Sequence, residues 1–311
     1  MRSTNRRQFV KGTLAAAALA APLLRAAEST QAATTEPRAA AASKQAPDKK
    51  PRLSVLSYSF RGLLEQGQMD LFGYLESCKY RFRLDAADIW TGFLPNTDAG
   101  FLKKVRDALD ERELTLADLC VDTGPLWEDT PEARQRNREK ILAHLKVAET
   151  LGARFMRVDA GGRDTSWSAE QFDYVVAQYR EHAQWAWDHG FRMGAENHWG
   201  TEGIWANLQK LYRAVDHPGF GLSIHIGGWQ GTPEEKAEAD RQVAPWVCHT
   251  HFDWDTTHGP LEQKMANLRG VGYQGYYSVE HHSGKNEYAE VAIQLALVRS
   301  VFDRWRGGEN A

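Results

Sequence analysis

The stretch "FRMGAENHWG" (residues 191–200) is a short apolar run that ends in a carboxylate, an amide and an imidazole. A buried charge is costly unless it is paired or binds a metal, so a glutamate at the end of an apolar strand needs a partner. Short apolar runs of this kind recur along the chain and alternate with longer amphipathic stretches. The fold that this alternation predicts decides which residues can be the partner of Glu196.

Eight short apolar runs are predicted to be strands: residues 52–60, 86–91, 114–121, 153–160, 191–196, 219–226, 247–252 and 275–282. Between them lie helical patterns, of which the clearest are residues 137–152, 168–190 and 287–305. Alternating strands and helices predict a parallel sheet. Eight such units over residues 52–306 indicate a single-domain α/β fold, the (β/α)8 TIM barrel. The competing doubly wound sheet is disfavoured because no Gly-rich dinucleotide motif follows an early strand.

Four of the predicted strands end in groups that bind metals. They are Glu196, His225, His251 and Glu280, on the fifth to the eighth strand in chain order. Active sites of these barrels form at the C-terminal strand ends, and alternate residues of a strand point inward, so the four side chains are predicted to converge. Two carboxylates and two imidazoles suit one divalent ion such as Mn, Zn, Co or Mg. Each residue alone could equally be an interior polar group satisfied by a neighbour.

These motifs resemble the xylose-isomerase-like TIM-barrel superfamily, which includes sugar phosphate isomerases and epimerases. The family has a Glu at the end of its fifth strand in an "E-N-H"-like motif, matched by Glu196, Asn197 and His198. A His at the end of the seventh strand is matched by His251, and a Glu after "G-Y-x-G" is matched by Glu280 in "GYQGYYSVE". The resemblance covers roughly residues 52–305.

The resemblance implies a dual role for Glu196 and Glu280, as metal ligands and as the catalytic acid/base pair. It also implies that His198 and Arg157 orient substrate oxygens. For Arg157 an interior ion pair with Asp159 or Glu196 is the alternative.

The chain departs from the family pattern on the sixth strand. The family usually has an Asp ligand there, in an Asp-x-x-His pattern. This sequence has His225, with Gly228 at the third place after it. An imidazole in place of a carboxylate removes one negative charge from the site, and the missing second His removes a substrate contact.

Six tryptophans each follow a different predicted strand, from the second to the seventh: Trp90, Trp127, Trp167, Trp199, Trp229 and Trp254. Those positions surround the mouth of a barrel, where flat indole faces suit a sugar ring or an aromatic aglycone. Five of the six are predicted to contact substrate: Trp90, Trp127, Trp199, Trp229 and Trp254. The alternative for any of them is packing within a loop.

Taken together, the motifs predict a metal-dependent sugar isomerase or epimerase. A carboxylate would move a proton on the carbon next to a carbonyl, and a divalent ion would stabilise the resulting enediolate. The alternatives are a lyase or hydratase acting on an oxidised (keto) sugar or glycoside, and a non-catalytic carbohydrate-binding barrel. A nuclease of the endonuclease IV branch would need a basic face, and nucleic acid is not an expected partner.

The first residues predict export. "NRRQFVKG" (residues 5–12) precedes a short apolar run, a pattern that resembles a twin-arginine signal, so residues 1–27 are predicted to be a signal peptide read by the twin-arginine machinery. Residues 28–51, rich in Ala, Pro and Lys, are predicted to be a disordered linker. Removing residues 1–27 deletes five basic residues and no acidic one, which changes the formal net charge from -3 to -8. The mature protein is therefore expected to be acidic and periplasmic, or otherwise exported.

Replacing Arg6 and Arg7 together by Lys is expected to trap the precursor in the cytoplasm, because the paired arginines are the feature that the twin-arginine machinery reads. Cell fractionation and immunoblotting measure this. Undiminished appearance of the double variant in the periplasm would show that the signal is an ordinary secretory one.

Overall fold

The computed structural model describes residues 52–308, and within them eight parallel strands form a near-closed barrel. The strands pair in the order β1-β8-β7-β6-β5-β4-β3-β2, and an isolated parallel bridge between Leu56 and Asp88 joins the two ends of the sheet. The predicted TIM barrel is confirmed. The strands are β1 (Leu53–Val55), β2 (Ala86–Trp90), β3 (Thr115–Val121), β4 (Phe155–Val158), β5 (Arg192–Glu196), β6 (Phe220–His225), β7 (Val247–Phe252) and β8 (Tyr277–Val279).

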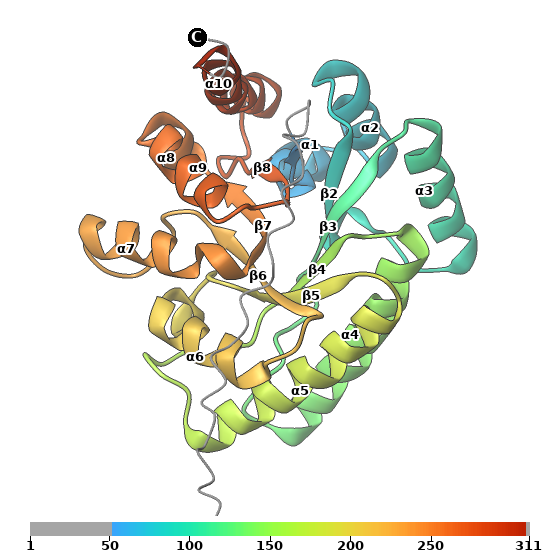
Figure 1. Ribbon diagram of the computed structural model, residues 1–311. Helices are drawn as coiled ribbons and strands as arrows, with labels where there is room; N and C mark the ends of the chain where they lie inside the picture. The colour runs from blue at the N-terminus through green and yellow to red at the C-terminus, as the bar shows by residue number, and fades with distance from the viewer. Residues whose placement is uncertain (1–51, 309–311) are drawn as a thin grey trace, which may run out of the picture. The chain divides into compact units, whose positions relative to one another are not determined.

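Helices follow one another round the outside of the strands in chain order, from α2 to α10 (Figure 1). The α-helices are α1 (Arg61–Glu65), α2 (Leu71–Glu76), α3 (Ala99–Glu111), α4 (Pro131–Leu151), α5 (Ala169–Asp188), α6 (Trp205–Val215), α7 (Pro233–Val243), α8 (Trp254–His258), α9 (Leu261–Gly270) and α10 (Glu287–Gly308). Short sequence signals set their ends. Ser168 and Gln171 form a capping box at the start of α5, and Gly152 ends α4 in the left-handed conformation, at φ 68°.

Most strands are shorter than predicted, and the differences at β1 and β8 affect the mouth of the barrel. The run 52–60 leaves the sheet after Leu56, and Ser57–Phe60 form a 3-10 helix. The run 275–282 is a strand only over Tyr277–Val279, so Glu280 follows the strand as the first residue beyond it. Glu280 nevertheless stays bound to β7, because its backbone N–H donates to the Phe252 carbonyl at 2.9 Å.

Strand alternation separates an apolar layer from a polar interior. On β2, buried Ala87 and Ile89 alternate with buried Asp88, and on β4 Met156 and Val158 alternate with Arg157. The apolar members join the large hydrophobic core, while the polar members contact polar side chains of other strands inside the barrel. The interior of this barrel is thus unusually polar, whereas bulky branched side chains usually dominate there.

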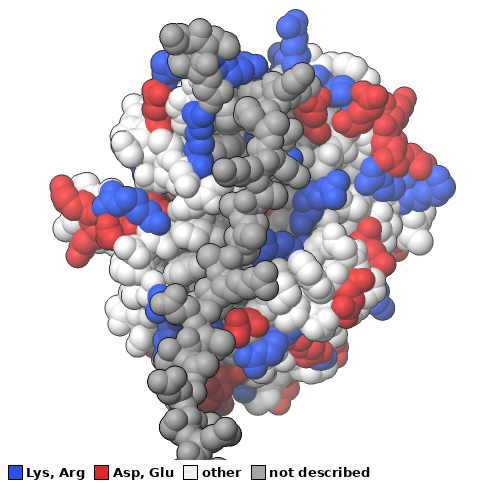
Figure 2. Space-filling model, in the orientation of Figure 1, with Lys and Arg blue, Asp and Glu red and all other residues white. Residues whose placement is uncertain are grey.

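The predicted signal peptide (residues 1–27) and linker (residues 28–51) lie outside the described residues. Among residues 52–308 no helix is long and apolar enough to cross a membrane. On the face shown in Figure 2, Lys and Arg side chains are interspersed with Asp and Glu side chains.

Candidate metal centre and active site

The four predicted ligands converge at the C-terminal end of the barrel. Glu196 Oε1 lies 2.7 Å from His251 Nδ1 and 3.2 Å from His225 Nε2. Glu280 Oε2 lies 3.4 Å from His225 Nε2 and 3.6 Å from His251 Nδ1. Because β5, β6, β7 and β8 are consecutive neighbours in the sheet, the two imidazoles lie between the two carboxylates.

This donor set fits a divalent ion. One ligand atom from each of His225, His251 and Glu280 lies within 4.8 Å of the others. Glu280 Oε2 is buried and accepts no hydrogen bond within the described residues, which leaves a lone pair directed to the two imidazoles. Mixed imidazole and carboxylate ligands suit first-row divalent ions, and Glu196, His225, His251 and Glu280 would hold one.

Opposite charges set the protonation of the site. Burial alone would raise the pKa of Glu196, but Arg157, His225 and His251 hold it well below the usual value. Burial opposes ionisation of Glu280 as well, yet His225 and its neighbours lower its pKa to about 2. Burial also disfavours the charged form of His225, but the two carboxylates outweigh it and raise its pKa to about 9. In the metal-free protein at neutral pH, both glutamates are therefore ionised and His225 is protonated.

Arg157 is held by carboxylates. Its Nε lies 2.8 Å from Glu196 Oε2, and its Nη1 donates to Asp159 Oδ2 at 3.3 Å and to Asp122. The guanidinium is 3% exposed. This is the interior ion pair that was the alternative expectation for Arg157. It places the positive charge of the guanidinium next to Glu196 Oε2.

His198 connects the metal centre to the rim of the barrel. Its Nδ1 lies 3.5 Å from Asp159 Oδ2 and 3.9 Å from Glu196 Oε2. Its ring stacks on Trp199, with centroids 4.0 Å apart and planes 15° from parallel. Burial lowers the pKa of His198, but Asp159 and Glu196 outweigh this and raise it overall. A partly exposed imidazole next to Glu196 is well placed to meet a substrate oxygen.

The sequence analysis did not identify His282 as a site residue. Its Nε2 lies 3.1 Å from Glu280 Oε1, and its ring faces that of His225 with centroids 5.9 Å apart. The imidazole is 46% exposed, so it stands at the mouth of the barrel. The repeated His in "EHHSG" was the available signal, and position 282 lies on the same side of an extended chain as Glu280.

A second polar layer lies deeper in the barrel. Asp88 Oδ2 accepts a hydrogen bond from Ser54 Oγ at 2.7 Å and lies 3.2 Å from His249 Nε2. Cys120 donates its thiol to Asp118 Oδ2 at 3.2 Å, and its sulfur lies 3.9 Å from His251 Nε2. When a histidine binds a metal through one ring nitrogen, a neighbour of this kind commonly fixes the other ring nitrogen. This layer therefore orients the His251 ring from the deeper side of the barrel.

The predicted tryptophans do not all face the mouth. Trp199 is 57% exposed at the rim, and half-buried Trp90 donates its indole N–H to Asp122 at 2.7 Å. Half-buried Trp254 stacks on His258. Trp229 is 2% exposed and donates its N–H to Asp240, and Trp127 is 8% exposed. The placement of Trp229 favours loop packing, the alternative that the sequence left open.

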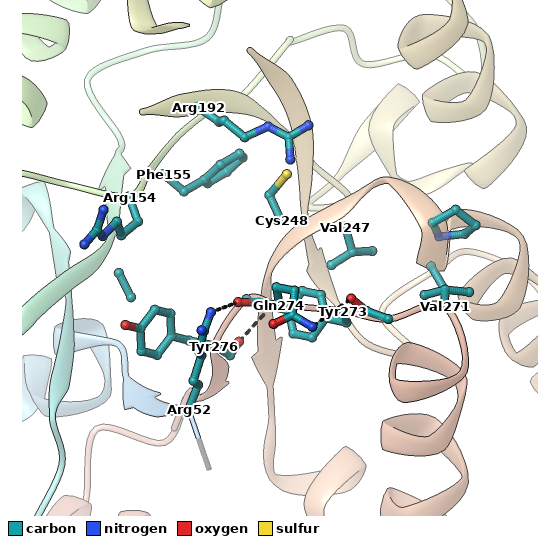
Figure 3. Close-up of a pocket in the computed structure, with 15 residues that line it drawn as sticks. Arg52, Arg154, Phe155, Arg192, Val247, Cys248, Val271, Tyr273, Gln274 and Tyr276 are labelled. Atoms are coloured by element: carbon teal, nitrogen blue, oxygen red, sulfur yellow. Dashed lines mark hydrogen bonds between the residues drawn. The ribbon is translucent and has the colours of Figure 1, made fainter. Parts of the chain in front are cut away.

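A cavity of about 670 Å³ lies at the opposite end of the barrel (Figure 3). Residues at the starts of strands line it, among them Arg52, Arg154 and Arg192. Its described lining contains no carboxylate and no imidazole, so it lacks the groups for the chemistry above. The candidate active site is therefore the C-terminal end, where TIM-barrel enzymes carry theirs.

The chain resembles a known protein family over most of its length. A family model described as "Xylose isomerase-like TIM barrel" matches residues 74–300. No curated protein matches the chain.

Several solved structures share the fold at low sequence identity. A 3-keto-D-glucoside 4-epimerase from E. coli superposes with a TM-score of 0.66 at 16% identity, covering 81% of this chain and 100% of that chain. A D-psicose 3-epimerase from Clostridium cellulolyticum H10 gives 0.64 at 14% identity, covering 82% and 98%. A probable 3-DHS dehydratase from Bacillus anthracis gives 0.62 at 14% identity, covering 80% and 98%.

We expect the purified protein to bind close to one divalent ion, and Glu280→Gln and His251→Ala each to lose it, because each variant removes one of the converging ligands. Elemental analysis after dialysis measures the metal content. His189→Ala is the matched control, because His189 is exposed and contacts no carboxylate. Unchanged metal content in both ligand variants would contradict the assignment.

Metal affinity is expected to rise with pH up to about 9, because His225 must lose its proton before it can bind a cation. Below that pH, one released proton corresponds to roughly a tenfold change in affinity per pH unit. Titration with a competing chelator between about pH 6 and pH 8 measures this dependence. Equal affinity across that range would mean that His225 is neutral there or is not a ligand.

Proposed function

Because the chain belongs to the xylose isomerase-like TIM barrel family, we propose that it is a divalent-metal-dependent sugar isomerase or epimerase. The observation that carries this proposal is the position of Glu196 and Glu280 on either side of His225 and His251. A sugar bound over the imidazoles would have an ionised carboxylate on each side. Such an arrangement suits removal of a proton from one face of a carbon and its return elsewhere.

The residues of the chain have distinct parts in this proposal. One ionised glutamate takes the proton from the carbon next to the substrate carbonyl and becomes protonated, which leaves an enediolate. In an isomerisation the same glutamate returns this proton to the neighbouring carbon. In an epimerisation the other glutamate delivers to the opposite face a proton that it has first taken from solvent, and the first glutamate releases its proton to solvent. Arg157 keeps Glu196 ionised and fixes its orientation through the 2.8 Å contact of Nε with Oε2. His198 and His282 stand on opposite sides of the site, where each can donate a hydrogen bond to a substrate hydroxyl or carbonyl oxygen.

A bound divalent ion would act as a Lewis acid that draws electron density from substrate oxygens. The protein supplies its ligands and controls their protonation. His225 takes the position where the family pattern has an Asp, so the four ligands together carry one negative charge fewer. The carboxylates of Asp122 and Asp159 add negative charge behind Arg157.

The same chemistry is compatible with a lyase or hydratase that acts on a keto sugar, because elimination can begin with the same proton transfer. The solved structures that share this fold include epimerases and a probable dehydratase. The export signal that residues 1–27 predict would place the substrate outside the cytoplasm, and this part of the proposal rests on the sequence alone.

Incubation of the metal-loaded protein with ketoses in heavy water is expected to place deuterium on the carbon that epimerises or isomerises. Glu196→Gln and Glu280→Gln are each expected to slow this exchange by on the order of 10²-fold, the usual effect of losing a general acid or base. Proton NMR measures the exchange, and metal content is measured in parallel. Turnover of a sugar without solvent deuterium at any carbon would point to hydride transfer instead.

A further inference from the structure

A cavity of about 650 Å³ lies beside the metal centre, a volume within the range of small-molecule sites. Loops that follow β3, β4 and β5 form it, so it opens at the same end of the barrel as the metal centre. We call it the side cavity and define it by Trp127, Glu128, Asp129, Arg163, Asp164 and Trp199. None of these residues contacts the four predicted metal ligands directly among the described contacts.

Trp199 links the side cavity to the metal centre. It lines the cavity and stacks on His198, and His198 Nδ1 lies 3.9 Å from Glu196 Oε2. The exposed ring of Trp199 thus lies one stacked imidazole away from the proposed acid/base residue.

Trp127 and Trp199 give the side cavity the chemistry of a sugar site. Trp199 is 57% exposed and offers an indole surface to the C–H face of a ring. Trp127 is 8% exposed, and its indole Nε1 is buried without any hydrogen-bond partner. A buried N–H without an acceptor is costly, and a hydroxyl oxygen of a bound sugar would satisfy it.

The charged walls of the side cavity indicate a neutral ligand. Glu128, Asp129 and Asp164 carry three carboxylates against one guanidinium, that of Arg163. Within the described chain their side chains make no ion pair or hydrogen bond, so they are available to a ligand. Carboxylates accept hydrogen bonds from sugar hydroxyls, and their surplus repels phosphate or carboxylate groups.

We propose that the substrate is a glycoside whose second ring is an unphosphorylated sugar, bound in the side cavity while its first ring reacts at the metal centre. This proposal rests on the proposed function for the reacting ring. The second ring stacks on Trp199, accepts a hydrogen bond from the Trp127 N–H and donates hydroxyls to the three carboxylates.

The first test is equilibrium binding to the metal-loaded protein by calorimetry. The probes are D-glucose, the disaccharides maltose, cellobiose and trehalose, and trehalose 6-phosphate. At least one disaccharide is expected to bind about tenfold more tightly than glucose, as a stacked second ring implies. Trehalose 6-phosphate is expected to bind no more tightly than glucose. Equal binding of glucose and all three disaccharides, or tightest binding of the phosphorylated sugar, would overturn the proposal.

Three variants localise the effect. Trp199→Ala is expected to lower disaccharide affinity about tenfold, and Trp127→Phe, which removes only the N–H, roughly fivefold. Both should leave the metal content unchanged, because neither residue contacts a metal ligand directly. Trp187→Ala is the control, because Trp187 is a 50% exposed residue of α5 outside the cavity. Disaccharide affinity that is unaffected by Trp199→Ala and Trp127→Phe would overturn the assignment.

The binding test and the deuterium exchange test fail separately. Disaccharide binding that depends on Trp127 and Trp199, without deuterium exchange on any sugar, would leave the side cavity assigned and contradict the isomerase. Exchange that is equally fast on monosaccharides and glycosides, and insensitive to both tryptophan variants, would leave the isomerase and overturn the side cavity.

Discussion

The site depends on one buried carboxylate, that of Glu196. It is fully buried, yet Arg157 from β4, His225 from β6 and His251 from β7 all lie within 3.2 Å of its two oxygens. An isolated charge could not be held at this buried position. Removing one partner of a buried ion pair accordingly costs about 3–5 kcal/mol in typical proteins. The pairing therefore holds the C-terminal ends of four neighbouring strands, β4 to β7, together at the mouth of the barrel.

Charge balance explains why an imidazole can stand on the sixth strand. Without metal, the two ionised glutamates lie next to two cations, Arg157 and protonated His225. When a divalent ion binds, its positive charge would replace that of the proton on His225. An Asp at that position would add a third carboxylate that needs a cation at all times. A protonated His225 reduces the negative charge of the empty site, and it couples metal binding to proton release.

The sequence was sufficient for the fold and for the convergence of Glu196, His225, His251 and Glu280, because strand alternation and barrel topology determine both. It did not reveal the contacts of Asp88 and Asp118, because these lie within apolar runs, and a register shift between Ala87 and Asp88 sets which residues of β2 and β3 are paired. The spacing of His282 from Glu280 was a signal for its place in the site. Because β8 ends at Val279, however, the loop conformation beyond it decides which of the two histidines faces Glu280 Oε1. Loop conformation, which sequence patterns do not determine, also decided that Trp199 is exposed and Trp229 buried.

The two ends of the barrel differ in charge, and this difference limits the substrate. Three arginines line the cavity at the starts of the strands, while the C-terminal end carries Glu196, Glu280 and the three carboxylates of the side cavity. Each of these carboxylates stabilises a cation at the C-terminal end electrostatically. An anionic sugar would be attracted to a bound ion but repelled by the side cavity, whose guanidinium compensates only one of its three carboxylates. The arrangement therefore favours a neutral sugar, held by stacking and hydrogen bonds, over a sugar phosphate held by charge.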